Sequence, residues 1–161
     1  MNQFSFGTKP VSCHAYNGDE TKVAVSLNDE KVLIYRRVGN KWEKEAELIE
    51  HSGKVTGLDW AAKSDKIVSC SADRNAFVWQ LNEKSVWKPE LVVLRINRGA
   101  ICVKWSPLEN KFAVGTGSRV IAICYYDDDN KWWASKSIKK PIRSSVLSIS
   151  WHPNNYLIGQ F

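Results

Sequence analysis

The sequence contains the three residue types of a hydrolytic triad within one short stretch, as His51, Ser69 and Asp73. In such a triad the serine attacks a carbonyl carbon, the histidine takes the serine proton and the aspartate orients the histidine. The same residue types can instead form a buried structural set, because a buried carboxylate needs hydrogen-bond donors such as an imidazole N–H. The elements around these residues decide between the two interpretations.

Two further motifs resemble ligand-binding loops. The run Gly115-Thr116-Gly117-Ser118 looks like a phosphate-cradling loop, but the segment at 120–126 alternates like a strand and offers no helix N-terminus for an anion. We therefore predict a turn between two strands there. The acidic run Asp127-Asp128-Asp129-Asn130 lacks the glycine and the distal glutamate of a calcium-binding loop, which favours a solvated connection.

A basic stretch follows, with its cations at Lys136, Lys139, Lys140 and Arg143. As phosphate contacts these residues would make binding strongly dependent on salt. No aromatic residue is interleaved with them for stacking on single-stranded nucleic acid. A solvated sheet edge and contact with an acidic protein are the two main interpretations, and nucleic acid is not an expected partner.

Composition narrows the class of protein. The chain has 161 residues, with 23 Lys and Arg against 17 Asp and Glu, so the formal net charge is +6. Hydrophobic residues make up 43% and charged residues 25%, as in globular proteins. No apolar run is long enough to span a membrane, and the first residues do not resemble a secretory signal. The four cysteines, tens of residues apart, are interpreted as buried free thiols of a cytosolic protein.

Tryptophan reveals an internal repeat. Trp60, Trp105 and Trp151 are 45 and 46 residues apart, and Tyr16 precedes Trp60 by 44 residues. A second series keeps the same step of 45 residues, at Trp42, Trp87 and Trp132. Two aromatic series that repeat in phase indicate a structural unit of about 45 residues.

Each unit alternates apolar and polar residues over four short segments with turn residues between them, which predicts four antiparallel strands. The expected strands are 11–16, 22–26, 31–36 and 42–49; 54–60, 66–71, 76–80 and 87–96; 100–105, 111–116, 120–126 and 132–138; and 146–151. Four strands in each unit of about 45 residues are typical of a β-propeller, so the predicted fold class is all-β.

The second unit resembles the WD-repeat pattern, in which a loop histidine, a strand serine, a turn aspartate and a strand tryptophan form a buried hydrogen-bonded set. Carried over to this sequence, the set is His51, Ser69, Asp73 and Trp79. The sequence departs from the pattern where Glu50 replaces the usual glycine and Gln80 the usual aspartate. The third unit has Ile96 at the histidine position and Ser118 at the aspartate position, so we expect its network to be absent.

Longer strings are similar to the family of WD-repeat subunits of the actin-related protein 2/3 complex. They are 72–79, 86–89, 94–98, 103–115, 138–144 and 151–155. The resemblance implies a seven-bladed propeller, of which this chain holds about three and a half blades as the N-terminal part of a protein about twice as long. The expected units are a ring-closing N-terminal strand at 1–10, blades at 11–49, 50–96 and 97–138, and the start of a fourth blade at 139–161.

The resemblance also implies a function. It predicts a non-catalytic, cytoplasmic scaffold subunit of the actin cytoskeleton, without a cofactor or metal, that supports the nucleation of branched actin filaments. The implied partners are the other subunits of the complex, actin filaments and nucleation-promoting activators. A generic WD-repeat adaptor for another protein or chromatin partner is the alternative.

Candidate contact residues complete the interpretation. The predicted cations are Arg95, Arg98, Lys139, Lys140 and Arg143, because exposed Lys and Arg on loops suit acidic partners. The adjacent pair Trp132 and Trp133 places one indole on each face of a strand, so one of the two is predicted to lie at a subunit interface.

Overall fold

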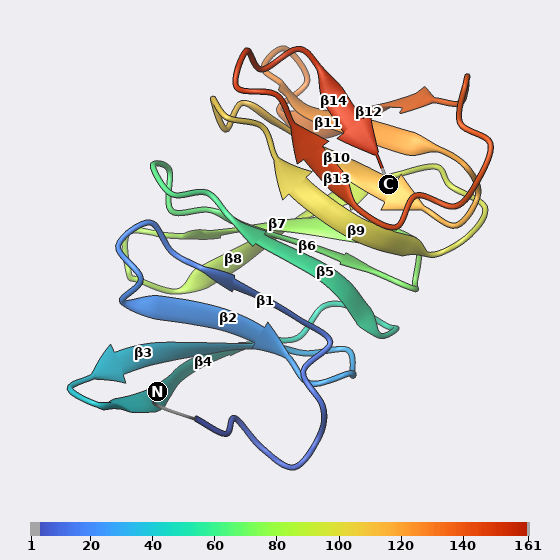
Figure 1. The fold of residues 1–161 in the computed structure, drawn as a ribbon. Coiled ribbons are helices and arrows are strands. Elements are labelled where there is room, and N and C mark those ends of the chain that lie inside the picture. The colour runs from blue at the N-terminus through green and yellow to red at the C-terminus, as the bar shows by residue number, and fades with distance from the viewer. Residues whose placement is uncertain (1–3, 161) are drawn as a thin grey trace.

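The computed structural model describes residues 4–160, where the secondary structure consists of strands without a helix. Three four-stranded antiparallel sheets and one two-stranded hairpin follow each other along the chain (Figure 1). The first sheet contains β1 (Cys13–Tyr16), β2 (Lys22–Ser26), β3 (Val32–Val38) and β4 (Lys41–Leu48). The second contains β5 (Val55–Trp60), β6 (Ile67–Ser71), β7 (Asn75–Leu81) and β8 (Trp87–Val93). The third contains β9 (Ala100–Trp105), β10 (Lys111–Thr116), β11 (Ile121–Asp127) and β12 (Trp132–Ile138), and the hairpin contains β13 (Ile149–Trp151) and β14 (Ile158–Gln160).

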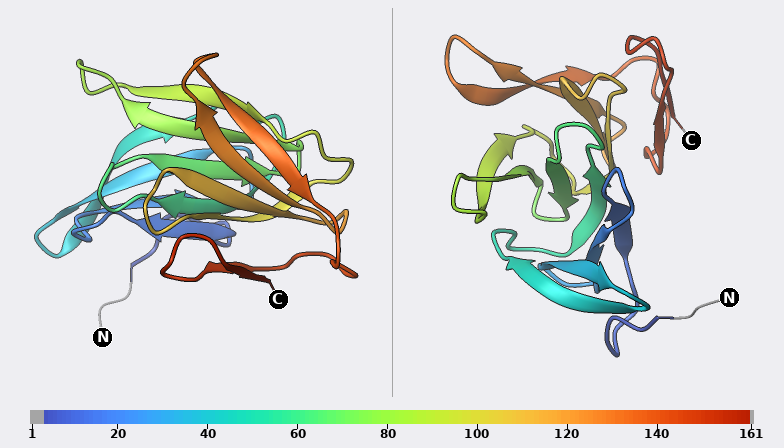
Figure 2. Two further views of the ribbon diagram at one scale, coloured as in Figure 1. Left: turned by 90° about the horizontal axis from the view of Figure 1, so that it is seen from above. Right: turned by 90° about the vertical axis from the view of Figure 1, so that its left-hand side faces the viewer.

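The sheets stand side by side as the blades of a partial β-propeller. The first strands of successive sheets, β1, β5, β9 and β13, contact one another in that order. The last strands, β4, β8 and β12, lie on the opposite side of the arc (Figure 2, right). This arrangement confirms the predicted all-β propeller architecture.

Several expected strands have different bounds in the structure, and three of the differences show why. The strand expected at 87–96 ends at Val93, because Arg95 has a φ of 52° and the chain leaves the sheet there. The strand expected at 11–16 begins at Cys13, and the strand expected at 146–151 begins at Ile149. Val146 is buried, and its amide donates to the carbonyl of Thr116 across the blade boundary. The alternation near Val146 therefore reflects packing between blades instead of pairing within one.

The interfaces between sheets form the hydrophobic core. One cluster joins the second and third sheets and includes Val68, Val78, Trp105, Phe112 and Trp133. A second cluster joins the first and second sheets. Burial between blades explains why strands such as β6 are buried along their whole length, since both faces of each sheet are covered.

Hydrogen bonds also tie neighbouring sheets together. The Asp59 carboxylate at the end of β5 accepts from Lys104 Nζ at 2.6 Å and from the Trp105 backbone N–H at 2.7 Å. The Thr56 hydroxyl donates to the Ala100 carbonyl at 2.8 Å. These bonds fix the rotation of the third sheet against the second.

The structure gives no support for a strand in the described part of the N-terminal segment 1–10. The ring-closing strand expected at 1–10 lies partly outside the described residues, and residues 4–10 contain no strand. In the described range, the structure has no helix of the length and apolar character needed to cross a membrane.

Candidate protein-contact surfaces

The structure brings His51, Ser69, Asp73 and Trp79 together in one connected network. Trp79 Nε1 lies 2.9 Å from Ser69 Oγ, and Ser69 Oγ lies 2.8 Å from His51 Nε2. His51 Nδ1 lies 2.9 Å from Asp73 Oδ2. The network links the loop before β5 to β6, to the turn after β6 and to β7.

The chemistry of the donors gives this chain of bonds a direction. An indole N–H can only donate, so Trp79 donates to the Ser69 oxygen. The Ser69 hydroxyl then donates to His51 Nε2, and His51 Nδ1–H donates to Asp73. This pattern requires a neutral imidazole protonated on Nδ1. The Ser–His–Asp bonds of a hydrolytic triad run in the same directions, so bond direction does not decide between the two interpretations.

The burial of its side chains distinguishes the His51 network from a hydrolytic triad. The side chains of His51 and Asp73 are 1% and 5% exposed, and Ser69 is fully buried. A nucleophile enclosed between blades cannot meet a substrate, so the geometry favours the structural interpretation. The network holds the loop at 50–53 against the turn at 72–75, with Ser52 N–H also donating to Asp73 at 3.0 Å.

The network predicts a pH dependence of stability. The pKa of the His51 imidazole lies below its ordinary value, because burial disfavours the charged form more strongly than Asp73 favours it. The unfolded chain has an ordinary histidine pKa of about 6.5, so below that pH it binds more protons than the folded chain. By linkage, the contribution of His51 to the free energy of unfolding is fully present above the unfolded-state pKa. It decreases as the pH falls below that value toward the lower pKa of the folded chain. We expect the thermal midpoint to fall between about pH 7.5 and about pH 5.5, and to fall less steeply in His51→Gln. Equal slopes for both proteins would contradict this assignment.

A polar hollow of about 450 Å³ lies between the third sheet and the segment leading to β13. We call it the basic hollow; its lining residues are Asn97, Arg98, Gly117, Ser118, Arg119, Ser144 and Ser145. Three separate segments supply them: the loop before β9, the turn between β10 and β11, and the segment after β12. The Gly115-Thr116-Gly117-Ser118 run thus contributes to a turn between two strands, as its sequence predicts.

The predicted contact cations divide between different places. Arg98 lines the basic hollow, whereas Arg95 lines a groove on the outer side of the propeller. Lys139, Lys140 and Arg143 are exposed on the segment between β12 and β13. The sequence interpretation missed Arg119. Its position directly after the Gly115–Ser118 run could have identified it, because a turn there places the following residue at the loop surface.

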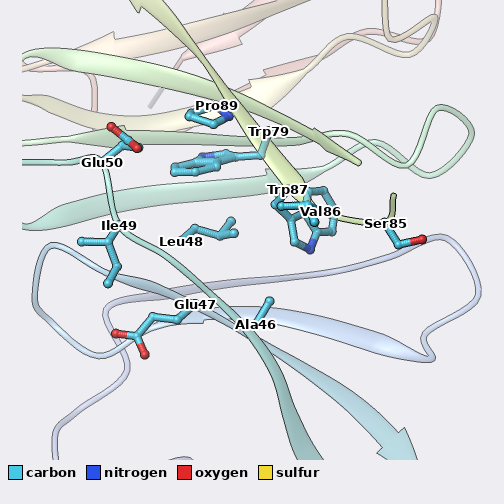
Figure 3. A pocket seen from close by; sticks show the side chains of 10 residues that line it. All are labelled: Ala46, Glu47, Leu48, Ile49, Glu50, Trp79, Ser85, Val86, Trp87 and Pro89. Carbon is cyan, nitrogen blue, oxygen red and sulfur yellow. The ribbon is translucent and has the colours of Figure 1, made fainter. Parts of the chain in front are cut away.

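Two equivalent grooves run between the last strands of neighbouring sheets. The first outer groove, about 410 Å³, is lined by residues 46–50 at the end of β4 and by residues around Trp87 on β8 (Figure 3). The second outer groove, about 270 Å³, lies one repeat of 45 residues further along. There Leu91, Val93 and Trp132 occupy the places of Ala46, Leu48 and Trp87.

The two grooves differ in charge and in their aromatic residue. Glu50 lines the first groove, and Arg95 takes the equivalent place in the second. Trp87 packs on Trp60 with ring centroids 5.8 Å apart. Trp132 is 60% exposed and has no aromatic neighbour among the described residues.

The tryptophan pair therefore splits as two faces of a strand require. Trp133 is buried against Trp105 and Phe112, and its indole N–H donates to Glu90 Oε2 at 2.8 Å. Trp132 faces outward beside Leu91 and Val93, both about half exposed. An exposed tryptophan flanked by apolar residues and one arginine is the composition of a protein-contact surface.

The remaining motifs have local roles. Asp127 accepts from the Asp129 and Asn130 backbone N–H groups and from the Asn130 side chain, so this carboxylate serves its own turn. The four cysteines are free; Cys70 and Cys124 are buried as expected, whereas Cys13 and Cys102 are only partly buried. In the described part of the chain, no cluster of three potential metal ligands occurs.

Known proteins are similar to this chain at two levels. The family model of the WD domain, G-beta repeat, matches residues 42–80, which run from β4 to β7 and contain the His51 network. Actin-related protein 2/3 complex subunit 1A-A of Xenopus laevis is 59% identical over 159 residues, 99% of this chain. The chain belongs to this subunit 1 family of WD-repeat proteins. Subunit 1A of Arabidopsis thaliana is 50% identical over 92% of the chain, and subunit 1 of Saccharomyces cerevisiae 43% over 93%.

The match to the subunit 1 family covers part of each relative. The chain spans 43% of the Xenopus laevis protein and 39% of each of the other two. With three four-stranded sheets and a hairpin, the structure is accordingly a partial WD-repeat propeller.

Proposed function

We propose that this chain is a non-catalytic scaffold subunit of the actin-related protein 2/3 complex and supports the nucleation of branched actin filaments. The observation that carries the proposal is the 59% identity to subunit 1A-A of that complex across 99% of the chain. The proposed partners are the other subunits, actin filaments through the complex, and nucleation-promoting activators. The proposed location is the cytoplasmic actin cytoskeleton.

The proposed mechanism is positional. Sheets joined by hydrogen bonds, such as those that Asp59 accepts from Lys104 and Trp105, form a rigid body that presents loops and outer grooves at fixed orientations. A rigid scaffold lowers the entropic cost of bringing partners together, because less freedom is lost when they bind. No side chain needs to take part in a reaction for this role.

A tagged form of the chain, expressed in cells and recovered with its partners, tests the proposal. Co-purification of the two actin-related proteins and the other subunits of the complex is the expected result. Recovery of a different protein or of chromatin, without any of these subunits, would favour the generic adaptor and contradict the proposal.

The variant Trp132→Ala, used in the same co-purification, tests which surface makes the contact. We propose that the second outer groove contacts another subunit through an apolar side chain, with a carboxylate opposite Arg95. Because Trp132 is exposed, its loss is expected to change the free energy of unfolding by only about 0.5 kcal/mol. Recovery of the complex is expected to fall about tenfold, as for an interface residue worth about 1.4 kcal/mol.

Leu108→Ala provides the matched control, because Leu108 is 64% exposed but lies in the turn between β9 and β10, outside both grooves. This variant is expected to recover the complex as well as the wild type. Equal losses for both variants, or none for Trp132→Ala, would remove the second outer groove from the interface.

A further inference from the structure

We propose that the basic hollow binds a phosphorylated side chain, a phosphoserine or phosphothreonine within an extended acidic segment of a partner protein. This inference goes beyond the scaffold role and does not depend on it. Three segments distant in sequence meet at the hollow, and each supplies hydroxyl, amide or guanidinium groups.

Backbone hydrogen bonds hold the three segments in place. The Gly117 N–H donates to the Gly99 carbonyl at 3.3 Å, which ties the turn after β10 to the loop before β9. The Val146 N–H donates to the Thr116 carbonyl at 3.1 Å, and the Ser145 hydroxyl to the Gly117 carbonyl at 3.4 Å. The walls are therefore linked before any ligand arrives, which reduces the entropic cost of binding.

Arg98 and Arg119 supply the charge. A β-carbon built on Gly117 would lie 3.7 Å from Cβ of Arg98 and 3.8 Å from its Cδ, so the Arg98 side chain extends across the turn that carries Arg119. Neither guanidinium makes a hydrogen bond or an ion pair within residues 4–160. Each guanidinium presents five N–H donors in a planar fork, the geometry that matches phosphate oxygens.

The hydroxyl groups around the hollow differ in what they can donate. The Thr116 hydroxyl donates to the Val120 carbonyl at 2.9 Å, so the Ser118 hydroxyl donates to Thr116. The Ser144 hydroxyl has no partner within the described residues and lines the hollow. It is available as a neutral donor in the hollow that Arg98 and Arg119 also line.

The surroundings favour an anion with more than one charge. The segments 94–101, 116–121 and 138–147 contain six cations and no Asp or Glu. The cations are Arg95, Arg98, Arg119, Lys139, Lys140 and Arg143. A phosphorylated side chain carries about −1.5 to −2 charges and three acceptor oxygens, whereas a carboxylate carries one charge and two oxygens. Two guanidiniums that line one hollow therefore discriminate in favour of the phosphate.

The shape favours a peptide over a membrane surface. The hollow is lined by polar side chains and glycine, without a large apolar residue that would enter a bilayer. Lys139, Lys140 and Arg143 follow one another along an irregular exposed segment that leads into Ser144. An extended peptide whose phosphate occupies the hollow can place acidic flanking residues along this segment.

Fluorescence anisotropy on the full chain tests the proposal with a labelled peptide that holds one phosphoserine flanked by glutamates. Matched peptides carry serine or glutamate in its place. We expect the phosphopeptide to bind at least about tenfold more tightly than either, and Arg98→Ala with Arg119→Ala to weaken it at least about 30-fold. The affinity of Arg98→Lys with Arg119→Lys is expected to lie between those of the wild type and the double alanine variant. Lysine keeps the positive charge but loses the planar set of guanidinium donors.

Arg36→Ala with Arg37→Ala is the charge-matched control, because it removes two exposed cations from β3, in the first sheet. It is expected to weaken the phosphopeptide less than about threefold, as for screened long-range charges. An equal loss in both double variants, equal binding of the glutamate peptide, or binding only to vesicles containing phosphatidylinositol 4,5-bisphosphate would each overturn the proposal. Retained thermal midpoints show that the variants are folded.

Discussion

Replacing Asp73 with alanine is expected to lower the free energy of unfolding by about 3 kcal/mol or more, because it leaves three donors without an acceptor. Asp73 Oδ2 accepts from His51 Nδ1 and from the Ser52 N–H, and Oδ1 accepts from the Asn75 N–H at 2.9 Å. With the carboxylate only 5% exposed, water cannot replace it without opening the turn. Thermal or denaturant unfolding measures the loss, which corresponds to roughly 6–12 °C in the midpoint for a chain of this size.

Asp128→Ala is the control for this change, because Asp128 is exposed in the turn after β11 and makes no hydrogen bond through its side chain among the described residues. Asp73→Asn is expected to be intermediate, since the amide keeps one acceptor oxygen and loses the other. A loss below about 1 kcal/mol for Asp73→Ala would mean that the network contributes little to stability.

The third blade shows that His51, Ser69 and Trp79 can be replaced together by apolar residues. Removal of a single member of the network is a different case. One repeat of 45 residues after His51, Ser69 and Trp79 stand Ile96, Val114 and Cys124. All three are buried in the cluster that joins the second and third sheets. The interior of a blade can thus hold either a fully hydrogen-bonded network or apolar side chains at the same positions. An incomplete network is destabilising, because its buried polar groups lose water without gaining a partner. The sequence interpretation expected this loss from Ile96 and Ser118.

The architecture could be predicted because its signals are local or periodic. Alternation identifies strands such as 100–105, 111–116 and 132–138 with the bounds that the structure has, and the tryptophan step fixes the repeat. Strand ends were wrong where apolar residues pack between blades. Val146 is such a case, because its buried side chain extends the alternating pattern beyond the hairpin.

The contact surfaces could be predicted only in part. Adjacency of Trp132 and Trp133 indicates opposite faces, but packing on Phe112 and the bond to Glu90 decide that Trp133 is the buried one. The basic hollow depends on residues that are about 20 to 25 positions apart, such as Arg98, Arg119 and Ser144, and only the paired loops bring them together. Sequence proximity therefore grouped Arg98 with Arg95, which the structure places in the second outer groove.

Phe112 occupies the centre of the contact between the second and third sheets. Its side chain is fully buried, with ring centroids 5.1 Å from Trp105 and 5.2 Å from Trp133. The same cluster includes Val68 and Val78 from the neighbouring sheet. Phe112→Ala would therefore leave a cavity between two blades, which rigid sheets joined by the Asp59 bonds cannot close.

We expect Phe112→Ala to lower the free energy of unfolding by about 3–5 kcal/mol, the sum of lost burial and the remaining cavity. Phe112→Leu preserves most of the volume and is expected to cost no more than about 1.5 kcal/mol, mainly from the lost aromatic contacts. Denaturant unfolding followed by tryptophan fluorescence measures both, because Trp105 and Trp133 report directly on this interface. Equal, small losses for the two variants would show that the blades relax into the space. The rigidity on which the scaffold mechanism depends would then have to come from the hydrogen bonds between the sheets, not from their packing.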